Sequence, residues 1–324
     1  MSEAPRVLVT GASGFVGRAV LDALARSGAA VTAAVRRETE LPAGVRVCRI
    51  GELGSGTDWG EALASCSHVV HLAARAHVMR DGSGDPLAEY RRVNVAGTLA
   101  LARQAVSAGV RRFVFVSSIK VNGERTAKGT AFSETDPLAP VDAYGISKAE
   151  AEAGLLDIAA AMAMEIVVIR PPLVYGPGVK ANFLTLIRWL ARGVPLPLGA
   201  VRENRRSFVG LGNLSDLILR CFHHPAAANQ VFLASDGEDL STTELLRRTA
   251  SALGVRARLV PVPVPILMAG ARLLGATETV RRLCDNLQVD ISKARRVLDW
   301  SPPFTVDQEL RRAVEPLRSK ELAG

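Results

Sequence analysis

The chain has 324 residues, of which 48% are hydrophobic and 22% are charged, and this balance is typical of a globular protein that buries a full core. The formal net charge is +8, but the basic residues are spread along the chain and not gathered into one tract, so we do not expect nucleic-acid binding. Arginines would serve a small phosphorylated ligand equally well.

Cysteine spacing and hydropathy exclude further classes. The four cysteines show no C-x-x-C spacing, which disfavours a zinc site, any other metal site and a disulfide framework. The N-terminal residues enter a strand-like run without a visible secretory signal. The longest apolar stretch, residues 259–276, holds three prolines and an arginine, whereas a spanning helix needs about 20 apolar residues. We expect a loop and a short helix there, in a cytoplasmic protein without membrane insertion, with membrane-surface contact as the alternative.

The first predicted elements are a strand over residues 6–10, a glycine loop and an amphipathic helix. Gly11, Gly14 and Gly17 have the spacing G-x-x-G-x-x-G. The first glycine permits a tight turn, the second lets a pyrophosphate approach, and the third allows close helix packing. A flexible turn is the alternative to a dinucleotide site. We assign to the cofactor the loop residues Gly11, Ser13, Gly14, Phe15, Val16 and Gly17.

The second predicted strand, residues 29–35, ends in Arg36 and Arg37. A protein that selects NAD usually has an acidic residue there for the ribose hydroxyls, whereas an arginine suits a 2′-phosphate. The pair therefore favours NADP over NAD. Two solvated charges at a strand end, or an arginine stacked on the adenine, remain open.

Strands and helices keep alternating through VRVCRI, WGEALASC, HVVHLAA, a long helix near residues 90–108 and RRFVFVSS. This alternation predicts an α/β fold with a doubly wound parallel sheet of the Rossmann type, whose ligands lie beyond the carboxyl ends of the strands. The cofactor residues that we expect at such ends are Glu52, Leu53, Leu72, Ala73 and Ala74.

A serine, a tyrosine and a lysine form the candidate catalytic set. Ser118 ends an apolar strand, and Tyr144 and Lys148 are four residues apart, so they share one helix face. A tyrosine is a poor base at neutral pH, but a lysine ammonium and a nicotinamide cation nearby would lower its pKa. Ser118 would hydrogen-bond the substrate oxygen. Tyr-x-x-x-Lys alone is mostly structural, but the serine-ended strand and the glycine loop favour catalysis.

Six motifs, which mark a match that runs from residue 6 to about residue 310, occur in order between residues 10 and 178: TGASGFVG, HLAA, VNVAGT, VFVSS, YGISK and RPPLVYGPG. Together they resemble the extended short-chain dehydrogenase/reductase family, specifically its nucleotide-sugar epimerases and dehydratases. The resemblance implies that Ser118, Tyr144 and Lys148 are the catalytic triad. It also implies that Pro171, Pro172 and Leu173 lie along the nicotinamide.

The composition changes after residue 177, where prolines and glycines interrupt the alternation. We predict an NAD(P)-binding domain over residues 1–177 and a smaller α/β substrate lobe over residues 178–324, some segments of which return to the first domain. The resemblance implies that this lobe binds a nucleotide diphosphate. We assign to the substrate Arg75, Asn182, Phe183, Arg206, Arg281 and Arg282. Arg205 is an alternative to Arg206, and each of these lobe arginines could instead be a solvated surface charge.

Departures from the family pattern narrow the reaction. Related 4,6-dehydratases have an Asp-Glu pair where this chain has Ile119 and Lys120, which disfavours dehydration. Epimerases often have S-S-A-T-V-Y-G where this chain has SSIKVNG, so Lys120 and Asn122 replace a hydroxyl and an aromatic group. Leu173 stands where many relatives have asparagine.

Three functions follow as hypotheses from the resemblance. The leading one is reduction of a UDP-linked 4-keto or 4-keto-6-deoxy sugar with NAD(P)H in bacterial surface-polysaccharide synthesis. The alternative is a UDP-hexose 4-epimerase acting on UDP-glucose or UDP-N-acetylglucosamine. A noncatalytic dinucleotide sensor is the third. The resemblance also implies a homodimer that pairs through the helices near residues 90–108 and 144–163, although packing within one chain would also explain their small residues.

Overall fold

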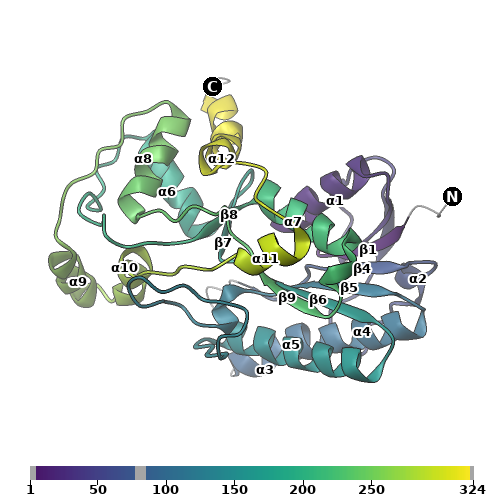
Figure 1. Cartoon of the computed structure of the whole chain (residues 1–324). Coiled ribbons are helices and arrows are strands. Elements are labelled where there is room, and N and C mark those ends of the chain that lie inside the picture. Colours follow the sequence, from purple (N-terminus) through teal and green to yellow (C-terminus); the bar gives the residue numbers. More distant parts are fainter. Residues whose placement is uncertain (1–4, 77–84, 322–324) are drawn as a thin grey trace.

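The computed structural model describes residues 5–76 and 85–321. Its main sheet has seven parallel strands in the order β3-β2-β1-β4-β5-β6-β9 (Figure 1). The strands are β1 (Arg6–Thr10), β2 (Ala30–Val35), β3 (Arg46–Arg49), β4 (His68–His71), β5 (Arg112–Val116), β6 (Glu165–Arg170) and β9 (Gln230–Leu233). This order confirms the predicted Rossmann-type sheet. The strand order reverses between β1 and β4, which is where such sheets bind ligands.

Helices cover both faces of the sheet (Figure 1). One face carries α1 (Phe15–Arg26), α7 (Leu211–His223) and α11 (Ser292–Leu298), and the other carries α2 (Gly60–Leu63), α3 (Pro86–Tyr90), α4 (Gly97–Ser107) and α5 (Ala143–Ala161). A π-helical turn, Arg91–Ala96, joins α3 to α4. Short 3₁₀ turns lie at Ile119–Val121 and Pro225–Ala227. The long helices predicted near residues 90–108 and 144–163 are therefore present.

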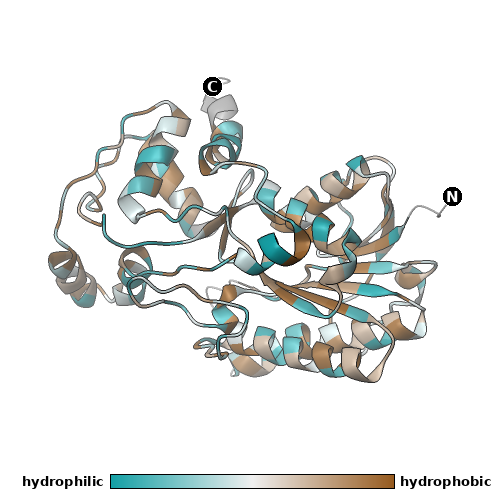
Figure 2. Ribbon diagram, in the orientation of Figure 1, coloured by the Kyte–Doolittle hydropathy of each residue, from teal (hydrophilic) through white to brown (hydrophobic). Residues whose placement is uncertain are grey.

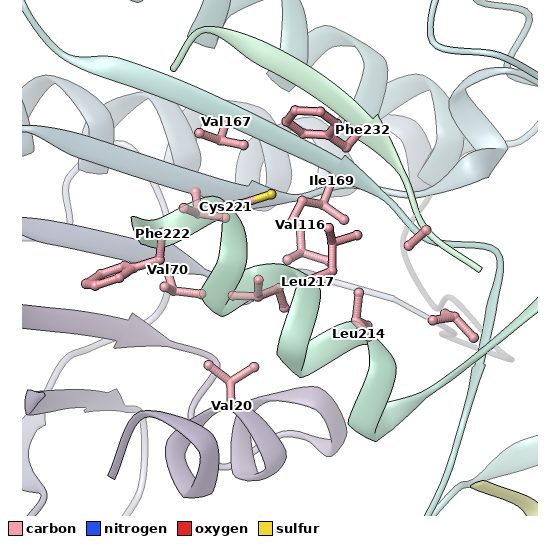
Figure 3. Close-up of a cluster of buried hydrophobic side chains, with 14 of the residues drawn as sticks. Val20, Val70, Val116, Val167, Ile169, Leu214, Leu217, Cys221, Phe222 and Phe232 are labelled. Atoms are coloured by element: carbon pink, nitrogen blue, oxygen red, sulfur yellow. The ribbon is translucent and has the colours of Figure 1, made fainter. Parts of the chain in front are cut away.

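The side chains on both faces of the sheet are apolar, because helices cover and bury both faces. Successive side chains of a strand point to opposite faces, so Val7 and Val9 of β1 join one core cluster while Leu8 joins the other. Figure 3 shows the first cluster, in which Leu217 of α7 lies between the sheet and Val20 of α1. The packing holds the glycine loop, which precedes α1, against the carboxyl end of the sheet.

A smaller lobe follows the first six strands (Figure 1). Its two parallel strands are β7 (Leu173–Tyr175) and β8 (Phe208–Gly210), and its helices are α6 (Ala181–Ala191), α8 (Thr242–Leu253), α9 (Val264–Leu273), α10 (Thr277–Cys284) and α12 (Val306–Glu321). The chain returns from this lobe to the sheet, where β9 pairs with β6 and α7 packs against α1. The domain boundary at residue 177 stays a prediction.

Candidate active site

The glycine loop has no room for side chains. Gly11 has φ +66°, and a Cβ there would lie 2.7 Å from the backbone nitrogen of Ala73. A Cβ on Gly17 would lie 2.1 Å from the carbonyl oxygen of Gly11. Helix α1 begins after Gly14 without a side-chain cap, so its first N–H groups are available to an anion. The loop fits a dinucleotide pyrophosphate.

The predicted adenosine-side residues follow β2 and β3. Arg36 and Arg37 are exposed directly after β2. Glu52 is exposed, with its carboxylate 3.8 Å from the Arg92 guanidinium, whereas Leu53 is buried and touches the position of Gly97. These residues flank the carboxyl ends of neighbouring strands, as predicted from the alternation.

A buried threonine–histidine network holds the turn after β4. The Thr10 hydroxyl oxygen accepts from the backbone N–H groups of Leu72 and Ala73, both at 3.2 Å, and lies 2.6 Å from His71 Nδ1. Burial lowers the pKa of His71 to about 3, so its ring is neutral. Since both lone pairs of the Thr10 oxygen are used, its O–H donates to Nδ1, and His71 Nε2–H donates to Thr98 Oγ1 at 2.9 Å. This network positions the predicted cofactor residues Leu72 and Ala73.

The three predicted catalytic residues come from β5 and α5. Ser118 is partly buried and caps the 3₁₀ turn after β5. Lys148 is 2% exposed, and its Nζ donates to the carbonyl oxygen of Val116 at 2.8 Å and lies 4.2 Å from the centroid of the Phe115 ring. Burial lowers the pKa of Lys148 to about 7. Tyr144 lies one turn earlier on α5, so all three residues stand at the same sheet edge.

The predicted lowering of the tyrosine pKa is not produced by the protein groups. Burial, and then the charges of Asp142 and Tyr90, raise the pKa of Tyr144 above its ordinary value of 10. The Lys148 ammonium instead donates to Val116. The positive charge of a nicotinamide ring is the remaining group that could favour the phenolate.

Asn94, which we did not assign from the sequence, ties the catalytic helix to the β4 turn. Its Oδ1 accepts from Arg75 N at 2.7 Å, and its Nδ2 donates to the Ser147 hydroxyl at 2.9 Å. Ser147 donates in turn to the carbonyl oxygen of Tyr144. The Tyr90 ring packs edge-on against Tyr144, with the Arg75 guanidinium 5.6 Å from its centroid. The sequence signal that could have pointed to Asn94 is its position inside a predicted helix, because asparagine is unfavourable in helix interiors.

Lys120, the residue at the dehydratase acid position, is paired with two carboxylates. Its Nζ lies 2.8 Å from Glu124 and also contacts Asp142. Asp142 caps α5 by accepting from Gly145 N at 2.7 Å. Burial opposes ionisation of Asp142, but the hydrogen bonds from Lys120 and Gly145 hold its pKa below the ordinary range. Lys120 therefore braces the start of the catalytic helix.

Asn122, the second departure from the epimerase pattern, belongs to a buried polar cluster. Its Oδ1 accepts from Arg170 at 3.1 Å, and Arg170 also pairs with Glu152 of α5 at 2.6 Å. Glu152 is 1% exposed and Arg170 is 4% exposed. Removal of either charge would leave the other buried and unpaired, so the cluster fixes α5 against β6.

The predicted residues beside the nicotinamide follow β6. Pro171 and Pro172 are buried, and the carbonyl oxygen of Pro171 accepts from Ile119 N at 2.9 Å. Leu173 begins β7 and is 44% exposed. The backbone contact joins this turn to the 3₁₀ turn that Ser118 caps.

Two of the predicted substrate arginines lie near one another. Arg206 is partly buried, which lowers its pKa, and its Nη1 donates to the carbonyl oxygen of Asp285 at 3.0 Å. Arg282 lies 3.5 Å from Glu124 and acts on the same Arg206 electrostatically. Arg281 is exposed and pairs with Glu278 of its own helix at 2.9 Å. The structure thus brings Arg206 and Arg282 together and leaves Arg281 paired elsewhere.

The start of α6 holds the remaining predicted substrate pair. Asn182 is exposed, whereas Phe183 is 5% exposed and packs against Tyr175, with ring centroids 5.8 Å apart. A contact of Phe183 with a phosphate would therefore come from its backbone N–H.

Two absences concern residues 5–76 and 85–321 alone. Within these ranges no three His, Cys, Asp or Glu side chains gather as metal ligands. Within the same described ranges, every helix is too short or too polar to cross a bilayer.

The sequence profile of the NAD dependent epimerase/dehydratase family matches residues 7–234. The chain belongs to this family. A Vibrio cholerae relative named UDP-glucose 4-epimerase is 46% identical over 95% of this chain and 94% of its own length. An Escherichia coli O157:H7 relative, named N-acetyl-alpha-D-glucosaminyl-diphospho-ditrans,octacis-undecaprenol 4-epimerase, is 27% identical over 95% and 94%.

A solved structure of the same fold is MoeE5 in complex with UDP-glucuronic acid and NAD. It has a TM-score of 0.77, is 28% identical, and covers 97% of this chain and 99% of its own. The family membership that the six motifs predicted is confirmed. This family member is an enzyme of the NAD-dependent, nucleotide-sugar epimerase/dehydratase type.

Proposed function

We propose that the protein is a UDP-hexose 4-epimerase that keeps NAD bound throughout its reaction. The supporting observation is the 46% identity with the Vibrio cholerae UDP-glucose 4-epimerase over nearly the whole chain. In the sequence analysis this function is the alternative to reduction of a 4-keto UDP-sugar. Reduction of a 4-keto UDP-sugar stays the second candidate, on the substitutions Lys120 and Asn122.

Proton movement at C4 falls to the residues at the ends of β5 and α5. The dinucleotide, when bound, supplies reversible hydride transfer. Tyr144 Oη takes the proton from the C4 hydroxyl as that carbon loses hydride, and it returns the proton when hydride comes back to the opposite face. Ser118 donates a hydrogen bond to the same oxygen. Lys148, held in the buried space beside Phe115, would hold the nicotinamide ribose, and the positive charge of a bound nicotinamide would favour the phenolate.

The turn after Ser118 argues against dehydration. Elimination of water needs an acid and a base at neighbouring sugar carbons. The turn Ile119–Val121 carries no carboxyl group, since Ile119 is buried and apolar and the Lys120 ammonium is ion-paired with Glu124 and Asp142. The chemistry that this turn can support is hydride and proton exchange at one carbon.

The uridine diphosphate would be held by Arg206 and Arg282. Guanidinium groups pair strongly with phosphate oxygens, and the two arginines lie close enough to influence each other. Arg282 forms an ion pair with Glu124 at 3.5 Å, and it would exchange this pair for one with the diphosphate. Arg75, Asn182 and Arg281 stay predictions as substrate residues.

We propose NAD as the cofactor because the matching family is described as NAD dependent and the MoeE5 structure is a complex with NAD. Arg36 and Arg37 predict instead that NADP binds well, since both are exposed at the end of β2. Titration of nucleotide-free protein with NAD and NADP, with Arg36→Ala as the control for the phosphate contact, separates the two.

We also propose a homodimer through α4 and α5. Leu156 of α5 is 40% exposed, and the exposed ion pair between Arg91 and Glu150 at 2.6 Å lies beside the same helices. Packing within the chain explains Gly154, where a Cβ would meet Leu99 at 2.8 Å, so that glycine does not itself require a partner. Light scattering of Leu156→Arg tests the proposal, which predicts a monomer for the variant.

The function is tested on protein purified without added nucleotide. We expect close to one NAD per chain by mass spectrometry after denaturation, and conversion of UDP-glucose to UDP-galactose without added cofactor. Protein that retains little NAD and consumes NADH or NADPH with a 4-keto UDP-sugar would overturn the epimerase proposal and support the reductase.

A further inference from the structure

Helix α9 lies at the end of the lobe away from the sheet (Figure 1). It exposes several apolar side chains. Ile266 is 61% exposed, and Leu273 and Leu274 at the other end of the helix are 89% and 83% exposed. The preceding segment, residues 254–263, adds Val260, which is 46% exposed. Figure 2 shows hydrophobic residues along α9 at this edge of the molecule. These apolar side chains are exposed to solvent and take no part in the hydrophobic core of the lobe.

The charge within residues 249–277 has one sign, and the first acidic residue after them, Glu278 of α10, is paired with Arg281. Residues 249–277 contain three arginines and no aspartate or glutamate. Arg256, Arg258 and Arg272 are all exposed. The first two also line, with Arg192 at the end of α6, a shallow pocket of about 660 Å³. Arg272 directly precedes the exposed Leu273 and Leu274, and Arg256 and Arg258 lie in the segment that leads into α9.

We propose that α9 and residues 254–263 form a docking surface for an anionic lipid bilayer. Helix α9 has 10 residues, a length of about 15 Å, so it is too short to span a bilayer of about 30 Å. A short helix with bulky apolar side chains and arginines nearby lies in the interface, where the side chains enter the acyl boundary and the guanidinium groups meet headgroup phosphates.

Two other occupants fit the same surface less well. A second copy that packed on this face would bring its own arginines against a segment that has no acidic residue to pair with them. A nucleic acid would use the arginines but not the exposed leucines. A negatively charged surface with an apolar interior uses both features.

This inference goes beyond the proposed function and does not depend on the sugar. The surface lies on α9, whereas the proposed catalytic residues lie at the ends of β5 and α5. Vesicle binding can therefore be measured apart from turnover, and failure of either experiment leaves the other intact.

The experiment is sedimentation of the full chain with vesicles of phosphatidylcholine alone and with vesicles that contain one third phosphatidylglycerol. Variants are Leu273→Glu with Leu274→Glu, Arg256→Gln with Arg258→Gln, and the matched control Val47→Glu, which alters an exposed residue of β3 outside the lobe (48% exposed). Turnover of a UDP-hexose and circular dichroism check that each variant folds.

We expect binding to the phosphatidylglycerol vesicles at least tenfold above binding to phosphatidylcholine, weakened by 0.5 M NaCl. The double leucine and double arginine variants should each lose on the order of tenfold in binding, and Val47→Glu should bind as the parent does. Absence of binding, or full binding by the leucine variant, would overturn the proposal. An oligomer that the leucine variant dissociates without any change in vesicle binding would overturn it as well.

Discussion

The sheet domain and the lobe hold their parts of the candidate site by different means. In the sheet domain, Gly17 packs against the backbone of Gly11, and Lys148 is buried with a hydrogen bond to Val116. In the lobe, Arg281 and Arg282 are exposed and are held by ion pairs to Glu278 and Glu124. Buried backbone contacts fix atoms for chemistry, whereas exposed ion pairs can be exchanged for ligand contacts.

Substitutions in the sheet domain and in the lobe should therefore have different effects. A substitution in the sheet domain should reduce stability, cofactor binding or turnover, because the buried contacts leave each of these groups a single position. A change in the lobe should alter the affinity for a sugar nucleotide and leave the fold intact, because an exposed pair contributes about 0–1 kcal/mol to stability.

Gly17→Ala should have the largest effect. The new Cβ would meet the carbonyl oxygen of Gly11 at 2.1 Å, and that backbone cannot move without displacing the glycine loop. We expect a loss of about 3 kcal/mol in the free energy of unfolding and loss of bound NAD, measured by urea denaturation and mass spectrometry. Gly56→Ala is the control, because a Cβ there meets nothing within 4 Å. Equal NAD content in both variants would break the contrast.

Tyr144→Phe should lower turnover by about 10²- to 10⁴-fold, because the phenol oxygen that exchanges the proton is removed while the ring remains. Bound NAD and stability should stay at parent levels. Tyr90→Phe keeps the ring that packs on Tyr144 and should retain most activity. Steady-state rates with UDP-glucose check both, and a Tyr144→Phe enzyme of normal rate would remove the catalytic assignment.

Arg206→Ala should raise KM for a UDP-hexose by about tenfold to hundredfold, the size of one or two lost hydrogen bonds to a charged group, with a smaller change in kcat. Arg281→Ala should raise KM much less, because Arg281 is exposed and already paired with Glu278 of its own helix. The pair of variants sharpens the contrast within the lobe. The same KM increase in both would mean that Arg281 also contacts the substrate.

Lys148→Met should change how stability depends on pH. Burial lowers the pKa of Lys148 from 10.5 to about 7, so between these values the unfolded chain binds more protons than the folded one. The free energy of unfolding of nucleotide-free protein should therefore rise with pH from 7 to 9 through this group. The variant should lack that increase in denaturant titrations at both pH values. Identical slopes in parent and variant would contradict burial of the ammonium.

Asp142→Ala should have the smallest effect, a loss of about 1 kcal/mol in the free energy of unfolding, since it removes the cap of α5 and one partner of Lys120. Asp142→Asn keeps an oxygen that can accept from Gly145 N and should lose less. Denaturant titration of both compares them. Equal losses would show that the charge pair with Lys120, and not the cap, supports the helix.

The sheet could be predicted, and the candidate site residues could be chosen, because their signals are local. Gly11 to Gly17 lie within one strand–loop–helix pattern, and Tyr144 and Lys148 lie one helical turn apart. Ser118 follows an apolar strand, and parallel strands bring their carboxyl ends to one edge. Periodicity and spacing are enough to select these residues, and their catalytic role stays a prediction.

The supporting contacts could not be predicted, because they join distant positions. Thr10 meets His71 across 61 residues, Asn94 meets Ser147 across 53, and Lys120 meets Asp142 across 22. No local pattern encodes such pairs. The rise in the Tyr144 pKa has the same origin, since burial and the neighbour Tyr90 exist only in the folded chain.

The most direct test of the central claim uses UDP-glucose that carries deuterium at C4. The purified enzyme is incubated with this substrate in ordinary water without added nucleotide, and the UDP-galactose formed is analysed by NMR and mass spectrometry. If Tyr144 exchanges the proton while retained NAD takes and returns the same hydride, the deuterium stays at C4 of the product. Loss of the deuterium to solvent, or no UDP-galactose from enzyme that holds NAD, would contradict the account.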